Sequence, residues 1–282
     1  MKAIILNLSA WIMLPVMDGF AKYLSSTLPI LQITWSRYFF TVVFVLPIML
    51  VFFRKNLTWT EQPKLQLIRG LLLFCANILF FYSISIISLA KALTLAFIAP
   101  LIVTLLSPIL LGEKVGFRRW AAVIVGFIGS LIVIRPGFVE FNLASFAALG
   151  TGVMYGFYLI VTRKLHNSDN PLLTLLLTGT VGAILGSIIM PTVWVQPTIN
   201  EWYMMFAIGF FASLGHFFLI LSLRYADASK LAPFGYFEIV PNIIIGYFFF
   251  NHFPNQWHFF GLFIIISSGI YIFRREMLNM PN

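Results

Sequence analysis

The sequence predicts an all-α membrane protein of ten transmembrane helices, built as two inverted five-helix repeats. Three observations predict this fold class: an apolar composition, a regular series of long apolar runs, and a weak similarity between the two halves. Hydrophobic residues make up 60% of the 282 residues, charged residues make up 10%, and the mean hydropathy is +0.96. Soluble domains carry roughly 25% charged residues. Lipid is therefore the solvent that many of these apolar side chains require.

Ten apolar runs of about twenty residues follow one another, and each is long enough to cross roughly 30 Å of hydrocarbon. They lie near residues 2–23, 30–53, 65–86, 89–111, 117–135, 143–162, 171–191, 202–224, 229–250 and 256–273. The connections are short, so neighbouring helices must be antiparallel and no domain outside the membrane fits. The one cysteine, Cys75, lies within an apolar run and leaves no partner for an internal disulfide.

Lysine and arginine are distributed unequally between the two sides of the membrane. Fourteen of the eighteen lie at the termini or in loops that follow even-numbered spans, and the other four are Lys22, Arg37, Lys91 and Arg135. Because positive residues accumulate in cytoplasmic loops, both termini are expected in the cytoplasm. The expected location is the bacterial inner membrane. The same placement explains the net charge of +9 without a nucleic-acid partner.

The second half of the chain repeats the first. A shift of 139 residues places Ser83 on Ser222 and Lys91 on Lys230. The repeats are expected at residues 1–137 and 138–282. Each holds five spans, an odd number, so the two must cross the membrane in opposite orientations. Inverted repeats are common in secondary transporters, whose substrate site lies near the midplane where the repeats meet.

Several short strings point to a known family. In the first half they are DGFAKYL at 18–24, RYFF at 37–40, RGLLLF at 69–74, the run 100–113 that ends in LGE, Trp120, and GFIG at 126–129; in the second half they are GH at 215–216, LAPF at 231–234 and FP at 253–254. With these strings the chain resembles the drug/metabolite transporter superfamily, in particular its EamA-type ten-helix members. Bacterial riboflavin and S-adenosylmethionine uptake transporters are the most similar in character. Two positions depart from the pattern: Ile239 replaces a frequent proline and His252 a frequent glutamate.

Charged residues inside the membrane are candidates for function, because each costs roughly 2.5–3.5 kcal/mol on insertion scales. Asp18 and Lys22 lie four residues apart on one face of the first span, and Arg37 lies about two turns into the second. We expect Asp18 to pair with Arg37 or Lys22 in an outer gate or a cavity wall. The alternative is that Lys22 extends its amine to the interface and Arg37 only neutralises Asp18.

Four polar side chains share a depth near the middle of their spans: Asn77, Tyr155, His216 and Glu238. Glu238 is expected either to bind a cationic or hydrogen-bonding part of the substrate or to carry a coupling proton. A histidine or asparagine in a membrane is also often a satisfied contact between helices. That alternative stays open for His216 and Asn77.

Aromatic and helix-breaking residues complete the candidate site. Most of the 31 phenylalanines are expected to face lipid or to pack, but Phe81, Tyr155 and Tyr236 lie on spans that carry deep polar groups and could stack on a flat heteroaromatic ligand. Prolines are expected to interrupt the fourth and ninth spans, at Pro100, Pro108, Pro233 and Pro241. Glycines are expected to permit close helix packing, at Gly182, Gly186, Gly209 and Gly215.

These features predict a secondary transporter that moves a small organic metabolite by alternating access, with riboflavin as the first candidate substrate. S-adenosylmethionine or an amino-acid metabolite, imported or exported, is the alternative within the family. A membrane enzyme would show clustered catalytic groups, whereas the nine acids and four histidines are dispersed. No catalytic residue, metal ion or cofactor is expected. The expected partners are the metabolite, the bilayer and a candidate coupling proton, and both a monomer and a homodimer remain open.

Overall fold

The computed structural model describes residues 1–56, 59–134, 142–251 and 256–278, and within these ranges the chain forms helices and no β-strand. The α-helices and the two 3₁₀-helices (η) are α1 Lys2–Leu24, α2 Ile30–Phe52, η1 Arg54–Asn56, α3 Pro63–Ile86, α4 Leu89–Ala96, α5 Ile98–Leu110, α6 Phe117–Ile134, α7 Leu143–Lys164, α8 Pro171–Val193, α9 Ile199–Tyr225, α10 Ala228–Leu231, η2 Ala232–Glu238, α11 Ile239–Phe250 and α12 Gln256–Leu278. In the described part, eight helical segments are long and apolar enough to cross a membrane. The predicted all-α membrane fold is confirmed.

Local sequence signals set several helix ends. Asn142 and Thr198 each accept a hydrogen bond from the backbone N–H three residues later and form a capping box at the start of α7 and α9. Pro63 and Pro171 occupy the first turn of α3 and α8, where the missing N–H has no partner to lose. The helical boundaries therefore follow the predicted spans closely.

The fourth and ninth spans are both broken into shorter helices, as the sequence predicts. Pro100 would clash with the carbonyl of Ala96, four residues earlier, and α4 ends at Ala96. In the ninth span the segment that contains Pro233 is the 3₁₀-helix η2. Pro241 lies in the first turn of α11 and Pro108 near the end of α5, so neither breaks its helix.

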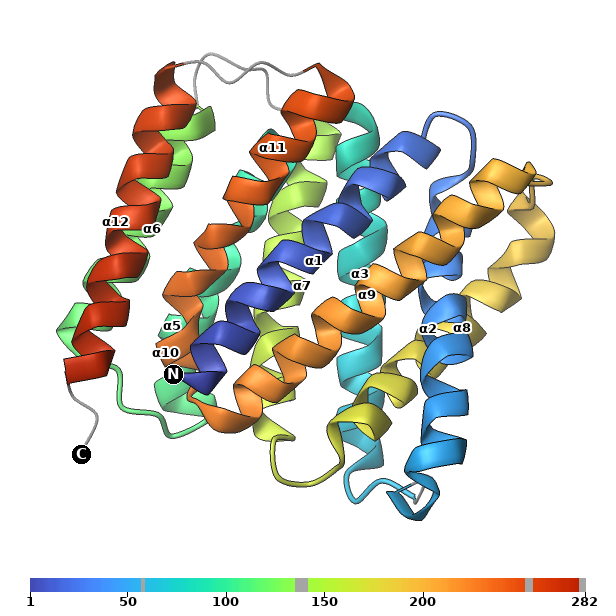
Figure 1. The fold of residues 1–282 in the computed structure, drawn as a ribbon, viewed down its shortest axis with the longest axis horizontal. Coiled ribbons are helices and arrows are strands. Elements are labelled where there is room, and N and C mark those ends of the chain that lie inside the picture. Colours follow the sequence, from blue (N-terminus) through green and yellow to red (C-terminus); the bar gives the residue numbers. More distant parts are fainter. Residues whose placement is uncertain (57–58, 135–141, 252–255, 279–282) are drawn as a thin grey trace.

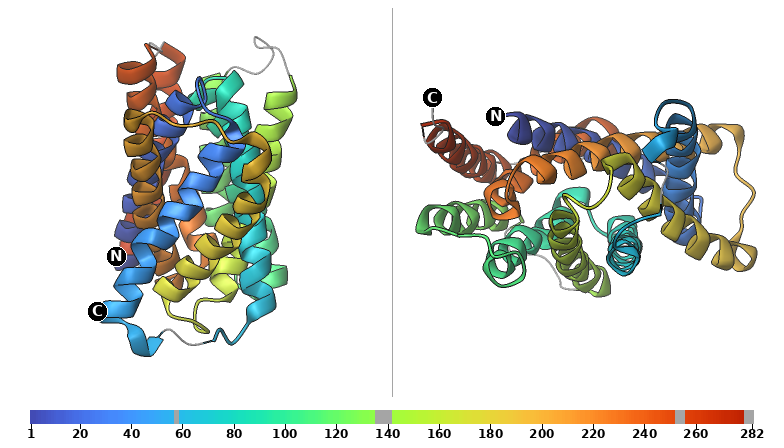
Figure 2. Two further views of the ribbon diagram at one scale, coloured as in Figure 1. Left: turned by 90° about the vertical axis from the view of Figure 1, so that its right-hand side faces the viewer. Right: turned by 90° about the horizontal axis from the view of Figure 1, so that it is seen from below.

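The helices form two layers (Figures 1 and 2). In the view from below, α1 and α9 lie in one layer, and α3, α5 and α7 lie in the other. The most extensive helix pairs are α1 with α9, α3 with α7, α2 with α8, and α6 with α12. Exchanging the two repeats converts the α1–α9 pair into the α3–α7 pair and maps the α2–α8 and α6–α12 pairs onto themselves. This is the contact pattern of two repeats related by a pseudo-twofold axis, and it agrees with the predicted inverted architecture.

Glycines allow close contact between helices, as the sequence predicts. The four sites lie against Tyr38 (Gly182), Trp35 (Gly186), Phe40 (Gly209) and Leu14 (Gly215). A Cβ atom at Gly209 would lie only 2.2 Å from the Cβ of Phe40.

Lys2 and the C-terminal end of α12 lie at the same end of the bundle, which we call the N-terminal end (Figure 1). The predicted repeat boundary between 137 and 138 lies outside the described residues, as do His252, Phe253 and Pro254.

Candidate substrate-binding site

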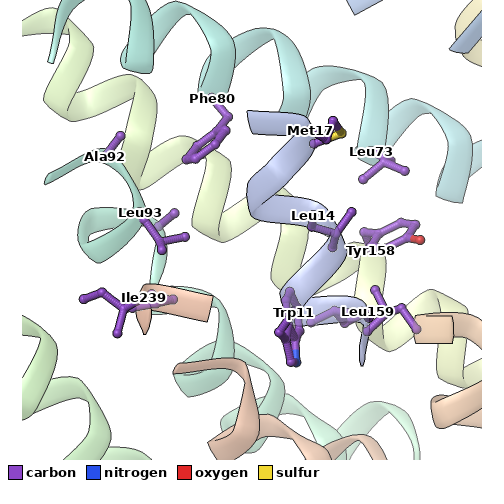
Figure 3. Packing of buried hydrophobic residues seen from close by; sticks show 14 of the residues in the cluster. Trp11, Leu14, Met17, Leu73, Phe80, Ala92, Leu93, Tyr158, Leu159 and Ile239 are labelled. Carbon is purple, nitrogen blue, oxygen red and sulfur yellow. The ribbon is translucent and has the colours of Figure 1, made fainter. Parts of the chain in front are cut away.

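A cavity of about 100 Å³ lies inside the bundle. Its walls come from the first, third and fourth spans of both repeats: α1, α3 and α4–α5 from the first, and α7, α9 and α10–η2 from the second. Figure 3 shows the apolar part of this region, with Trp11, Leu14, Met17, Phe80, Leu93 and Leu159 among its side chains. Ligand sites usually measure about 300–1,000 Å³. The cavity must therefore widen before it can hold a metabolite of the size of a nucleoside.

One stripe of α1 supplies a large part of the wall. Asn7, Trp11, Leu14 and Asp18 all line the cavity and are spaced four, three and four residues apart, which places them on one helical face. Asn7 accepts a 2.7 Å hydrogen bond from Trp11 Nε1 and donates to Ser222 Oγ at 3.3 Å. Asn7 and Trp11 were not among the predicted site residues, although their helical spacing from Asp18 places them on the same face of the first span.

Two carboxyl groups, Asp18 and Glu238, line the cavity. Asp18 is 3% exposed, and its Oδ1 is buried without a hydrogen-bond partner. Glu238 lies at the end of η2 and is close enough to Asp18 for the two carboxyls to interact electrostatically. Among the described residues, the Glu238 carboxyl has no hydrogen bond; only its backbone carbonyl accepts one, from Asn242.

Asp18 forms no salt bridge or hydrogen bond with Arg37 or Lys22 in this structure, although the Arg37 guanidinium still interacts electrostatically with the Asp18 carboxyl. Arg37 donates instead to Met17 Sδ at 3.2 Å and to His216 Nε2 at 2.5 Å. Lys22 donates to the carbonyls of Ile84 and Ile87. The helix geometry directs both cations to other acceptors and leaves the Asp18 carboxyl facing the cavity.

Asn77 and Tyr155 add polar groups to the wall. Asn77 donates from Nδ2 to Tyr38 Oη at 2.8 Å and to the carbonyl of Leu73 at 2.6 Å. Its Oδ1 is thus the group it can offer to a ligand, as an acceptor. The Tyr155 hydroxyl is buried without a partner, and its ring contacts Trp11 with centroids 6.3 Å apart.

His216 connects the cavity to two buried arginines behind the wall. A guanidinium can only donate, so His216 Nε2 accepts from Arg37, and Nδ1 carries the hydrogen that it donates to Tyr158 Oη at 2.9 Å. Tyr158 Oη also accepts from Arg69 Nη2 at 2.8 Å. Arg69 makes further bonds to Thr162, Thr174 and Thr178. Both guanidinium groups are therefore occupied behind the wall, whereas both carboxyl groups face the cavity.

The structure brings five of the nine predicted site residues to this cavity: Asp18, Asn77, Tyr155, His216 and Glu238. The other four lie outside its wall: Arg37 contacts it through His216, Lys22 caps the end of α3, Phe81 is 1% exposed in the core, and Tyr236 packs between Phe97 and Gly126. The positions of polar residues within the spans predicted five polar wall residues but not Asn7, and they did not show which aromatic rings face the cavity.

Comparison with known sequences assigns the family. The profile of the EamA-like transporter family matches residues 1–135 and 142–274. The chain belongs to the EamA-like transporter family. This multi-pass membrane fold therefore serves transport, and the predicted family is confirmed.

Relatives of this EamA-like transporter differ in what they carry. The chain is 29% identical to an S-adenosylmethionine uptake transporter of Rickettsia prowazekii, over 98% of this chain and 96% of that one. It is 27% identical to a riboflavin transporter of Vibrio cholerae, over 95% and 92%. A solved structure with 16% sequence identity covers 99% of both chains with a TM-score of 0.81, which shows a common fold.

Proposed function

We propose that this EamA-like protein is a secondary transporter that carries a cationic, ring-containing metabolite of the S-adenosylmethionine type across the bacterial inner membrane by alternating access. The observation that carries this proposal is the pair of cavity carboxyls, Asp18 and Glu238, neither of which has an ion-pair partner in the described part of the chain. Because buried charge is costly, such a pair favours a ligand that brings positive charge.

The rest of the wall favours the same kind of ligand. Asn77 offers an acceptor, and the two acids accept hydrogen bonds when ionised. The rings of Trp11, Phe97 and Tyr155 can contact a cation or a flat base. S-adenosylmethionine combines a sulfonium, an ammonium and an adenine ring, and relatives at 29% and 30% identity are named for its uptake.

Riboflavin is the second candidate substrate. The aromatic wall residues and the Vibrio cholerae relative favour it. Riboflavin carries no positive charge, so it would bring no counter-charge to the two carboxyls. The carboxyls therefore favour S-adenosylmethionine over riboflavin.

The orientation belongs to the same proposal. The excess of lysine and arginine at the N-terminal end favours a cytoplasmic location for both termini. Dispersed acids and histidines favour a carrier over a membrane enzyme, and isolated polar groups, rather than a continuous polar stripe, favour a carrier over a channel. When no substrate is bound, a proton on Asp18 or Glu238 can take the place of the cation, which links transport to the proton gradient.

Uptake into proteoliposomes tests the substrate. We expect radiolabelled S-adenosylmethionine to accumulate in the liposomes. Unlabelled S-adenosylmethionine should compete at concentrations at least about tenfold lower than S-adenosylhomocysteine, because the latter lacks the sulfonium charge. A tenfold difference in affinity corresponds to roughly 1.4 kcal/mol of binding free energy. Glu238→Gln and Asp18→Asn should each reduce this discrimination. Glu61→Gln, which changes an exposed loop acid, is the matched control.

Two results would contradict this assignment. One is competition by riboflavin at lower concentrations than S-adenosylmethionine, which would favour the second candidate. The other is unchanged discrimination in both acid variants, which would remove the carboxyls from substrate recognition.

A further inference from the structure

Each repeat places a cation at the end of its first helix, against the end of a helix in the same repeat. Lys22 lies in the last turn of α1 and donates to the carbonyls of Ile84 at 2.7 Å and Ile87 at 3.1 Å, at the end of α3. Arg163 lies in the last turn of α7 and donates to the carbonyl of Leu223 at 2.8 Å, at the end of α9. Ile84 and Leu223 are 139 residues apart, the shift that relates the repeats. The two acceptor carbonyls are therefore equivalent, the cations that bind them are 141 residues apart, and the two contacts lie at opposite ends of the bundle.

The contact at the N-terminal end contains carboxylates as well. Arg163 donates from Nη2 to Asp227 at 2.8 Å and from Nε to Glu113 at 3.1 Å. Glu113 also accepts from the backbone N–H groups of Ala228 at 2.9 Å and Ser229 at 3.0 Å, and from Ser229 Oγ at 2.7 Å. Glu113 lies between α5 and α6 of the first repeat, so these bonds join it to the start of α10 in the second.

This cluster holds the wall of the cavity itself. Leu223 and Ala228 both line the cavity, and their backbone groups are bound by Arg163 and Glu113. Hydrogen bonds to ionised groups are stronger than those between neutral groups. Opening the cavity at the N-terminal end by moving the repeats apart requires breaking several of them together.

The opposite end has a weaker contact. The described partners of the Lys22 amine are two neutral carbonyls and the ring of Phe250, whose centroid is 5.7 Å away. The position equivalent to Asp227 is the uncharged Ser88. Among the described residues, carboxylates bind the cation only at the N-terminal end, while at the opposite end Glu201 accepts a separate 2.6 Å hydrogen bond from Thr27.

We propose that Glu113 and Arg163 are positioning residues that hold the N-terminal end of the cavity shut, and that Lys22 does the same less firmly at the opposite end. The empty transporter is then biased toward opening at the end that carries Lys22. This inference rests on the alternating access of the proposed function but not on the identity of the substrate.

Thiol labelling of the full-length protein in liposomes tests it without substrate. In a Cys75→Ser background, Leu231→Cys places a reporter on the cavity wall. A membrane-impermeant thiosulfonate is then added from each side in turn. Lys55→Cys, an exposed position at the N-terminal end, identifies that side. Glu113→Gln should raise reporter labelling from the N-terminal side by roughly threefold to tenfold, the scale of one weakened charge-assisted contact. Lys22→Met should raise it from the other side.

Controls separate this effect from general loosening. Glu61→Gln, an acid at the same end, should leave both rates unchanged. Ser229→Ala removes one hydrogen bond to Glu113 and should give a smaller increase from the N-terminal side, even if Glu113→Gln unfolds the protein. Unchanged labelling in both the Glu113 and Ser229 variants, or faster labelling from the opposite side, overturns the proposal. Failure of S-adenosylmethionine uptake alone leaves these labelling rates unaffected, so the two proposals fail separately.

Discussion

Tyr155 carries its hydroxyl into the cavity region without a hydrogen-bond partner among the described residues. An unsatisfied buried hydroxyl costs roughly 1–3 kcal/mol, and a bound substrate is the natural partner for it. Tyr155→Phe should therefore keep or raise the thermal midpoint of the empty protein and lower the additional stabilisation by substrate. Thermal unfolding in detergent with and without S-adenosylmethionine measures both. A lower midpoint for the empty variant would mean that the hydroxyl has a structural partner.

Glu113 should make the stability of the folded protein depend on pH in the acid range. Burial alone would raise the pKa of this carboxyl, but hydrogen bonds from Ser229, Ala228 and Arg163 outweigh it and lower the pKa below its ordinary value of 4.5. A carboxyl with a lowered pKa stabilises the folded state above its unfolded pKa, and this contribution is lost as pH falls through the folded pKa. Arg163, Arg119 and Asp227 are the charged groups around it.

The wild type should therefore be more stable than Glu113→Gln by a constant amount from about pH 8 to about pH 5, and the difference should shrink only at lower pH. Thermal midpoints of both proteins across this range measure the difference. Nearby His166 interacts electrostatically with Glu113, so both proteins are compared in a His166→Gln background, which removes its titration. A difference that already disappears near pH 6 would show that Glu113 is not held by these bonds.

At the scale of helices, close packing across the bundle depends on glycine. A methyl group at Gly209 would lie 2.2 Å from the Cβ and 3.1 Å from the Cα of Phe40, so the backbone of α2 would have to move. Overpacking of this kind costs about 1–3 kcal/mol. We expect Gly209→Ala to lower the thermal midpoint, whereas Gly116→Ala, with no atom within 4 Å of the added carbon, should not. Equal midpoints for the two variants would contradict the packing role.

The broken spans show how local sequence shapes the site. Pro100 ends the regular hydrogen bonding at Ala96, and both Ala96 and Pro100 line the cavity. In the second repeat, η2 ends at Glu238, which is also a wall residue. Irregular backbone in membranes occurs where protein or a cavity covers it. The irregular segments that contain Pro100 and Pro233 therefore contribute to the cavity wall.

At the scale of the whole molecule, the two repeats make equivalent contacts but carry different charges. The pairs α1–α9 and α3–α7 exchange under the pseudo-twofold relation. The acids face the cavity, whereas Arg37 and Arg69 lie behind its wall, linked through His216 and Tyr158. Under the proposed mechanism, this architecture supplies two conformations that exchange, and its unequal charges bias that exchange.

The sequence by itself determined the membrane class, the spans and the repeat, because the hydropathy of a segment and the positions of its prolines can be read along the chain without tertiary contacts. It also predicted Asp18 as a charged residue within the first span, and Asn77, Tyr155, His216 and Glu238 from their shared depth. The tertiary structure decided which residues meet. It placed Lys22 on the carbonyls of Ile84 and Ile87 and Arg37 on His216 rather than on Asp18, and it turned Trp11 instead of Phe81 toward the cavity. These contacts depend on how the helices are rotated and how closely they approach one another. The packing of segments that are far apart in the sequence sets both, and no single span encodes them.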